Sequence, residues 1–136
     1  MSDSQINQTT LDDFIIEGVI GKGSFGSVYL VKRKADNKLY ALKTVFLEKL
    51  NKKEKENSVN EVRLLASVSH PNVIGYKEAF LDDKNNTLNI IIEYADNGDL
   101  QTKISQKRKE QKVFNVKLIW SYAIQMIEGL KALHDK

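Results

Sequence analysis

The sequence has no cysteine, one proline, two histidines and no long apolar run. The absence of cysteine excludes disulfide bonds, thiolate metal sites and cysteine nucleophiles. His70 and His134 are too few for a histidine-based metal cluster. No stretch approaches the roughly eighteen consecutive apolar residues of a membrane-spanning helix, and the N-terminal residues carry acids and amides where a secretory signal has a basic start and an apolar core. We therefore expect a reducing, cytoplasmic location and no membrane partner.

Charge is nearly balanced, with 21 Lys and Arg against 18 Asp and Glu and a formal net charge of +3. Hydrophobic residues make up 41% of the 136 residues, enough apolar surface for one folded domain. The densest basic stretch, residues 103–112, holds five cations but is diluted by Glu110 and by uncharged residues. Without interleaved aromatic residues it is typical of a solvated helix face, so we expect no nucleic-acid partner.

Alternating and β-branched residues predict five strands, at residues 14–20, 27–32, 39–46, 73–81 and 88–94. The joints between the first three strands are short, which predicts an antiparallel meander. Apolar residues at three- and four-residue steps predict a helix over 59–68, which Pro71 ends. Residues 48–56 before it are either the solvated start of that helix or a loop. A short polar helix near 100–106 and a long amphipathic helix over 115–134 complete an α+β pattern.

Gly21-Lys22-Gly23-Ser24-Phe25-Gly26 matches G-x-G-x-x-G, which is a weak signature by itself. A dinucleotide-binding fold opens a helix with these glycines, whereas residues 27–31 alternate as a strand. The glycines therefore join two antiparallel strands, where backbone amides can approach a polyphosphate without a clash from Cβ atoms. A plain glycine-rich hairpin explains this loop equally well.

Lys43 lies on the strand that follows the glycine loop, flanked by apolar residues. A lysine buried there needs an anionic partner, and Glu61 on the predicted helix can supply one. Alternatively, Glu61 is an exposed helix residue that pairs with Lys55 or Arg63.

Taken together, these residues resemble the N-terminal half of a eukaryotic protein kinase domain, from about residue 14 to residue 136. The matching motifs, in chain order, are the glycine loop with Val28, Ala41-Leu42-Lys43, Glu61, His70-Pro71-Asn72-Val73, Ile92-Glu93-Tyr94, Gly98-Asp99-Leu100 and residues 129–134. Residues 93–100 and 129–136 are most similar to NIMA-related (NEK) serine/threonine kinases. Residues 1–10 are polar and terminal, which predicts a loose tail. The resemblance implies a kinase-like N-lobe of five antiparallel strands and one helix at 11–95, and the first helices of an incomplete C-lobe at 96–136.

The resemblance also implies an ATP site. Lys43 would bind the α- and β-phosphates and Glu61 would orient it; these are the two catalytic positions that the resemblance assigns. The other nucleotide-binding positions it implies are Gly21, Gly23, Ser24, Phe25 and Gly26 over the phosphates, Ile20, Val28 and Ala41 over the adenine, Ile92 at the back of the pocket, Glu93 and Ala95 at the hinge, and Asp99 near the ribose.

The family carries its catalytic base and its two Mg²⁺ ligands on His-Arg-Asp and Asp-Phe-Gly motifs, and neither occurs in these 136 residues. His134-Asp135-Lys136 falls at the end of the last helix, before the place of the catalytic motif. We therefore assign no metal ligand here, expect Mg²⁺ only in the full-length domain, and expect this chain alone to be inactive.

The expected function is that of the ATP-binding portion of a NIMA-like kinase, whose partners are ATP and a protein substrate phosphorylated on Ser or Thr. The family resemblance adds the cytoskeleton or cilium as locations. The alternative function is a non-catalytic, kinase-like module that docks a protein partner. Because no further helices cover the apolar face of residues 115–134, we also expect self-association through that helix.

Overall fold

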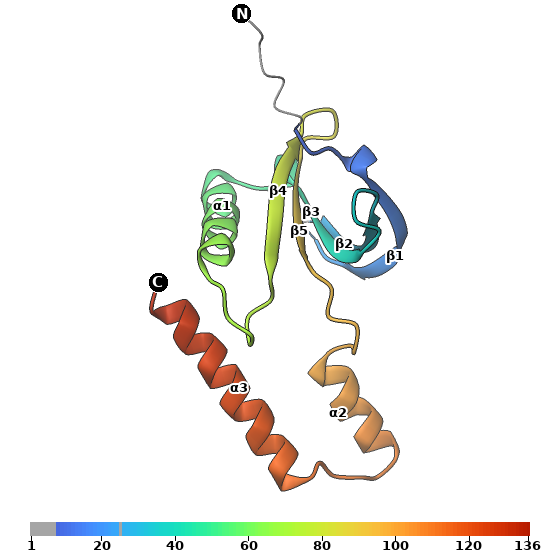
Figure 1. The fold of residues 1–136 in the computed structure, drawn as a ribbon, viewed down its shortest axis with the longest axis vertical. Helices are drawn as coiled ribbons and strands as arrows, with labels where there is room; N and C mark the ends of the chain where they lie inside the picture. The colour runs from blue at the N-terminus through green and yellow to red at the C-terminus, as the bar shows by residue number, and fades with distance from the viewer. Residues whose placement is uncertain (1–7, 25) are drawn as a thin grey trace, which may run out of the picture.

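The structure is a computed structural model that describes residues 8–24 and 26–136. Phe25, for which a role over the phosphates is predicted, lies outside the described residues. The first seven residues of the predicted tail also lie outside them. Within them, a β-sheet forms one part of the molecule and a pair of helices forms the other (Figure 1).

The sheet contains five antiparallel strands, which confirms the sheet predicted for the N-lobe. They are β1 (Phe14–Lys22), β2 (Gly26–Arg33), β3 (Leu39–Phe46), β4 (Tyr76–Asp82) and β5 (Thr87–Glu93), in the order β1-β2-β3-β5-β4. The strand predicted from residue 73 begins three residues later, at Tyr76. Val73 still belongs to the turn around Pro71, in which its N–H donates to the His70 carbonyl at 3.1 Å, and Ile74 and Gly75 form no regular structure.

The strand register separates two faces of the sheet. The core cluster is formed by Phe14, Val31, Tyr40, Leu42, Phe80 and Ile91, all buried. The Phe14 and Phe80 rings stack with centroids 6.3 Å apart. Since side chains alternate along a strand, the residues between these in β2, β3 and β5 point to the opposite face. That opposite face carries Val28, Ala41, Lys43 and Ile92.

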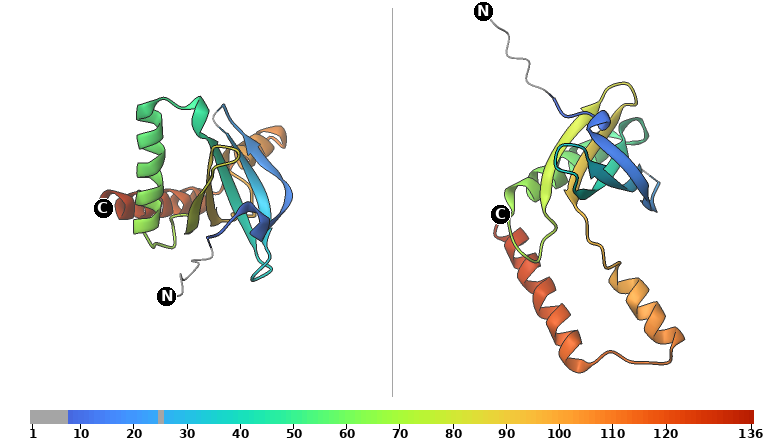
Figure 2. Two further views of the ribbon diagram at one scale, coloured as in Figure 1. Left: turned by 90° about the horizontal axis from the view of Figure 1, so that it is seen from above. Right: turned by 45° about the vertical axis from the view of Figure 1, so that its right-hand side comes forward.

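Helix α1 (Lys52–Ser67) lies beside β4 (Figures 1 and 2). It begins seven residues before the apolar periodicity starts at Val59, because a capping box forms between Asn51 and Glu54. The Glu54 N–H donates to Asn51 Oδ1 at 2.9 Å, and the Asn51 N–H donates to Glu54 Oε2 at 2.7 Å. The charged stretch is therefore part of α1 from Lys52 onward, whereas Glu48 and Lys49 belong to a separate 3₁₀ turn, Leu47–Lys49. No residue of α1 is buried, so its contact with the sheet is shallow.

Helices α2 (Leu100–Lys109) and α3 (Val116–His134) extend away from the sheet as a hairpin, with the loop between them at the far end (Figure 2). The predicted apolar side chains of α3 are exposed: Trp120 is 64% exposed and Ile127 is 66% exposed. No helix of the described residues is both long enough and apolar enough to cross a membrane.

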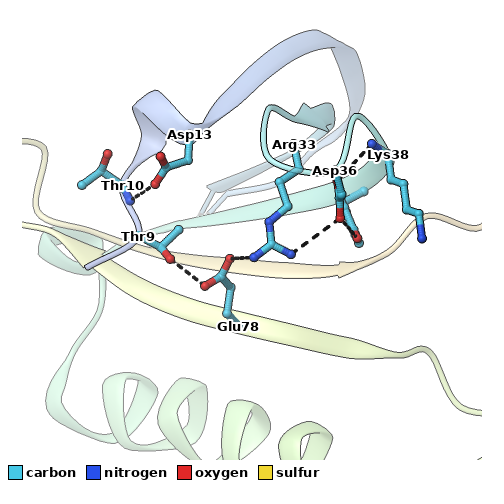
Figure 3. Close-up of polar contacts among 8 residues, drawn as sticks. Thr9, Thr10, Asp13, Arg33, Asp36, Lys38 and Glu78 are labelled. Carbon is cyan, nitrogen blue, oxygen red and sulfur yellow. Dashed lines mark hydrogen bonds and ion pairs between the residues drawn. The ribbon is translucent and has the colours of Figure 1, made fainter. Parts of the chain in front are cut away.

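A polar network ties the N-terminal segment to the outer edge of the sheet (Figure 3). The Thr9 hydroxyl donates to Glu78 Oε2 at 2.8 Å, and Arg33 Nη2 donates to Glu78 Oε1 at 3.2 Å. Arg33 also lies 3.8 Å from Asp36 Oδ2, which accepts a hydrogen bond from the Tyr40 hydroxyl at 2.7 Å. That last hydrogen bond lowers the pKa of Asp36 and raises the pKa of Tyr40.

Candidate nucleotide-binding site

The β1–β2 hairpin and strand β3 enclose a cavity of about 390 Å³ on the face of the sheet opposite the core. The turn of the hairpin is closed by a hydrogen bond from the Gly23 N–H to the Gly26 carbonyl at 2.8 Å. The cavity is lined by Gly21, Lys22, Gly23, Ser24, Gly26, Ser27, Val28, Lys43, Thr44 and Val45. The predicted loop residues within the described part of the chain and Lys43 thus line one space.

The three glycines of the loop differ in their surroundings. A Cβ added to Gly21 would meet nothing within 4 Å, and one added to Gly23 would meet only the Gly26 carbonyl oxygen, at 3.8 Å. A Cβ added to Gly26 would instead overlap the carbonyl oxygen of Thr44 on β3. Gly21 and Gly23 therefore leave room for a bound group, whereas Gly26 is required by the close approach of β2 to β3.

Lys43 forms an ion pair with Glu61 across the gap between β3 and α1. Lys43 Nζ lies 2.8 Å from Glu61 Oε1, and the two side chains are 38% and 52% exposed. The structure thus pairs Glu61 with Lys43 and not with Lys55 or Arg63. Because ion pairs this exposed stabilise a fold by only about 0–1 kcal/mol, the pair contributes little to stability and holds the lysine beside the loop cavity.

Lys43 also lines a second cavity, of about 250 Å³, between the sheet and α1. Its helix side is polar and consists of Glu54, Asn57, Ser58 and Glu61. Glu54, Asn57 and Ser58 are not among the predicted site residues. They lie seven, four and three positions before Glu61, so all four residues share one face of the helix. This spacing is the sequence signal by which they could have been found.

The predicted roof residues share the sheet face that carries Lys43. Val28 pairs with Lys43 in the β2–β3 register, and Ala41 pairs with Ile92 in the β3–β5 register. Ile20 lies beside a β-bulge between Val19 and Gly21 and is 49% exposed. This face therefore offers an apolar surface next to a cation, although Ile20, Ala41 and Ile92 do not line the loop cavity itself.

Glu93 and Asp99 lie apart from the glycine loop. The Glu93 N–H donates to the Gly75 carbonyl at 2.7 Å, and Glu93 Oε2 accepts from the Gly75 N–H at 3.0 Å, so this side chain is bound to the segment before β4. Asp99 caps α2, where Oδ1 accepts from the Thr102 N–H at 2.7 Å. Hydrogen bonds from Thr102 lower the pKa of Asp99.

Glu93 and Asp99 both line a third cavity, of about 500 Å³, together with Tyr122, Gln125 and Met126 of α3. The structure therefore divides the predicted site residues into two groups, one under the glycine loop and one at the junction with the helices. Ala95 is exposed and lies between Glu93 and Asp99, on the connection from β5 to α2. The roles of Glu93, Ala95 and Asp99 in binding a nucleotide stay predictions.

A close contact that the sequence does not predict joins α3 to the turn around Pro71. Asn72 Nδ2 donates to Gln125 Oε1 at 3.3 Å, and a Cβ added to Gly129 would lie 2.5 Å from the Asn72 carbonyl oxygen. The residues lie more than fifty positions apart in the chain, so no local pattern could reveal the contact.

Within residues 8–24 and 26–136, no group of three or more His, Cys, Asp or Glu side chains is placed to hold a metal ion. The described residues therefore fit the phosphate-binding part of a nucleotide site, through open glycines and a paired lysine, but provide no cluster for Mg²⁺. Mg²⁺ binding by the full-length domain stays a prediction.

The fold class is that of protein kinase N-lobes. It is defined by a five-stranded antiparallel sheet with one flanking helix, a glycine loop over a lysine–glutamate pair, and a following helical segment. The protein kinase domain model matches residues 14–136, and the chain belongs to this family.

Similar curated proteins include NEK serine/threonine kinases. The chain is 34% identical over 126 residues to the "Probable serine/threonine-protein kinase nek2" of Dictyostelium discoideum, which covers 93% of this chain and 30% of that protein. It is 36% identical over 126 residues to serine/threonine-protein kinase Nek5 of Homo sapiens, covering 93% of this chain and 17% of that protein. It is 35% identical over 117 residues to serine/threonine-protein kinase Nek1 of Mus musculus, covering 86% of this chain and 9% of that protein. The chain thus spans less than a third of the length of each of these relatives.

Proposed function

We propose that this chain is the ATP-binding portion of a NEK-type protein serine/threonine kinase, which transfers the γ-phosphoryl group of ATP to protein Ser or Thr hydroxyls. The observation that carries the proposal is the 2.8 Å ion pair between Lys43 and Glu61 at the edge of the glycine-loop cavity. A cytoplasmic location belongs to the same proposal.

The residues of the cavity suit the triphosphate of ATP. Backbone amides near Gly21 and Gly23 can approach phosphate oxygens because no side chain fills that space. Lys43 supplies a cation, and Glu61 limits the directions in which its ammonium points. Val28 and Ala41 provide apolar contact for the adenine ring on the same face of the sheet.

We expect Lys43→Met to weaken ATP binding by at least about tenfold, because a charge-assisted hydrogen bond to phosphate contributes about 1.5–3 kcal/mol. Lys32→Met is the matched control, since Lys32 lies on the neighbouring strand and is 36% exposed in its own ion pair with Glu17 at 3.7 Å. Isothermal titration of the 136-residue chain with ATP would measure both affinities. Equal losses in the two variants would contradict the proposed site.

Phosphoryl transfer tests the other half of the proposal. We expect the pure 136-residue chain to bind ATP without phosphorylating a generic protein substrate, because it carries no His-Arg-Asp or Asp-Phe-Gly motif. Radiolabelled ATP and mass spectrometry would report any transfer. Phosphate incorporation that Lys43→Met abolishes would show that other residues of this chain replace the missing catalytic groups.

A second candidate function, a non-catalytic module that docks a protein, is favoured by one observation. The exposed apolar side chains of α3 include Val116, Ile119, Trp120, Ile124, Met126, Ile127 and Leu130, each at least half exposed. A surface of this kind marks an interaction site.

We therefore expect the isolated chain to self-associate through α3. Its mass by light scattering should rise with concentration, and Trp120→Gln combined with Ile127→Gln should return it toward the mass of one chain. Glu128→Gln, an exposed polar change on the same helix, serves as the control. A monomeric mass for the unaltered chain at every concentration would refute self-association.

A further inference from the structure

The loop between α2 and α3 carries a concentration of positive charge that the nucleotide site does not use. We define residues 107–117 as the basic tip; it comprises the end of α2, the connecting loop and the start of α3. The tip contains five cations and one acid, a formal charge of +4, whereas all other residues of the chain together carry −1. It lies at the end of the molecule farthest from the sheet (Figures 1 and 2).

The backbone of the basic tip is well defined by hydrogen bonds. The Gln111 N–H donates to the Arg108 carbonyl at 3.1 Å, and the Lys112 N–H donates to the Lys107 carbonyl at 2.9 Å. Gln111, a residue other than glycine, occupies the left-handed position with a φ of 55°. These bonds form a Schellman motif, which presents Lys112 on an ordered scaffold.

The charges of the basic tip oppose local stability at two places. A Schellman motif commonly brings an apolar pair together at the two positions that Lys107 and Lys112 occupy here, so two like charges replace a hydrophobic contact. Lys117 lies in the first turn of α3, which contains no acid. The positive end of the helix dipole favours an acid at that place and disfavours a cation. Cations at the end of α2 stabilise that helix through its dipole. Lys112 and Lys117 lie outside α2 and do not contribute to this stabilisation.

The cations of the basic tip are also nearly free of internal partners. Among the described residues, the one ion pair that involves a tip cation joins Lys112 Nζ to Glu110 Oε2 at 3.7 Å, and the Lys112 side chain is 66% exposed. Lys109 and Lys117 are exposed as well. An anionic partner would relieve the mutual repulsion that the fold itself leaves uncompensated.

We propose that the basic tip is a docking surface for an acidic polypeptide segment rich in Asp and Glu. Val113, at the centre of the tip, is 88% exposed and offers an apolar contact that a peptide side chain can use. The one aromatic ring, Phe114, already lies 5.7 Å from the Lys107 ammonium and is not a free platform for a nucleic-acid base.

The test compares two triple variants with the same change in net charge. Lys109→Gln/Lys112→Gln/Lys117→Gln removes three exposed cations from the tip, and Lys52→Gln/Lys53→Gln/Lys55→Gln removes three exposed cations from α1. Fluorescence anisotropy with a labelled oligoglutamate peptide measures binding by the full chain. Circular dichroism establishes that both variants keep the fold.

We expect the tip variant to lose about tenfold in affinity for oligoglutamate and the α1 variant to lose less than about twofold, because three exposed ion pairs together account for a change of that size. Equal losses in both variants, or no measurable binding by the unaltered chain, would overturn the proposal. Tighter binding of a labelled oligouridylate than of oligoglutamate, with the same loss in the tip variant, would assign the surface to nucleic acid and would also overturn it.

Discussion

Gly26→Ala is expected to lower the free energy of unfolding by about 3 kcal/mol, at the upper end of the cost of overpacking. Gly26 opens β2 and pairs with Val45 of β3. The added methyl group would overlap the Thr44 carbonyl oxygen and lie 2.8 Å from its carbonyl carbon. Both are backbone atoms inside the sheet, so no side-chain rotation relieves the clash, and β2 must separate from β3. Chemical denaturation of the variant and the unaltered chain measures the difference.

Gly21→Ala is the matched control for this prediction. It adds the same methyl group to the same loop, but into open space, and its backbone is not left-handed. We expect its stability to stay within about 0.5 kcal/mol of the unaltered chain, or to rise slightly because the unfolded chain loses freedom. Similar stability losses in the two variants would show that the close approach of β2 to β3 does not impose the glycine at position 26.

Gly129→Ala is expected to loosen the contact between α3 and the sheet part of the molecule. The new Cβ would lie 2.5 Å from the Asn72 carbonyl oxygen and 3.3 Å from its carbonyl carbon. Alanine raises helix propensity by about 1 kcal/mol, whereas a clash with backbone costs about 1–3 kcal/mol. Since the clash outweighs the propensity, we expect a fall in melting temperature of about 4 °C or more and faster amide exchange at residues 70–75.

Glu128→Ala is the control for Gly129→Ala, because it places alanine one position earlier on the same helix at an exposed site. It should leave both the melting temperature and the exchange at residues 70–75 close to those of the unaltered chain. If Gly129→Ala behaves in the same way, α3 does not depend on its close approach to Asn72.

Much of the local structure could be predicted from the residues alone. Alternation along the strands predicts the antiparallel sheet, and the strand that follows the glycine loop excludes a dinucleotide-binding turn, because side-chain periodicity directly reflects backbone geometry. Apolar periodicity predicts α1 only from residue 59 and leaves residues 48–56 open between helix and loop, although the signal for an earlier start is present. Asn51 and Glu54 form a capping box, whereas apolar periodicity reports only the part of a helix that faces other atoms.

The start of β4 was placed too early for a different reason. Residues 73–75 have strand-like composition, but the turn bond from Val73 to His70 and the bonds between Gly75 and Glu93 determine their path. The bonds between Gly75 and Glu93 form only where the folded chain brings these two segments together, so the composition of residues 73–75 does not reveal them.

The sequence by itself determined the order and type of the elements, the glycine loop and the membership of Lys43 and Glu61 in a recognisable motif set. Only the tertiary structure decided that Glu61 pairs with Lys43, that Gly26 serves the sheet while Gly21 and Gly23 leave open space, and that Glu93 and Asp99 line a different cavity. The physical reason is distance along the chain. Periodicity and capping act between residues a few positions apart, whereas these contacts join segments that only the folded backbone brings together.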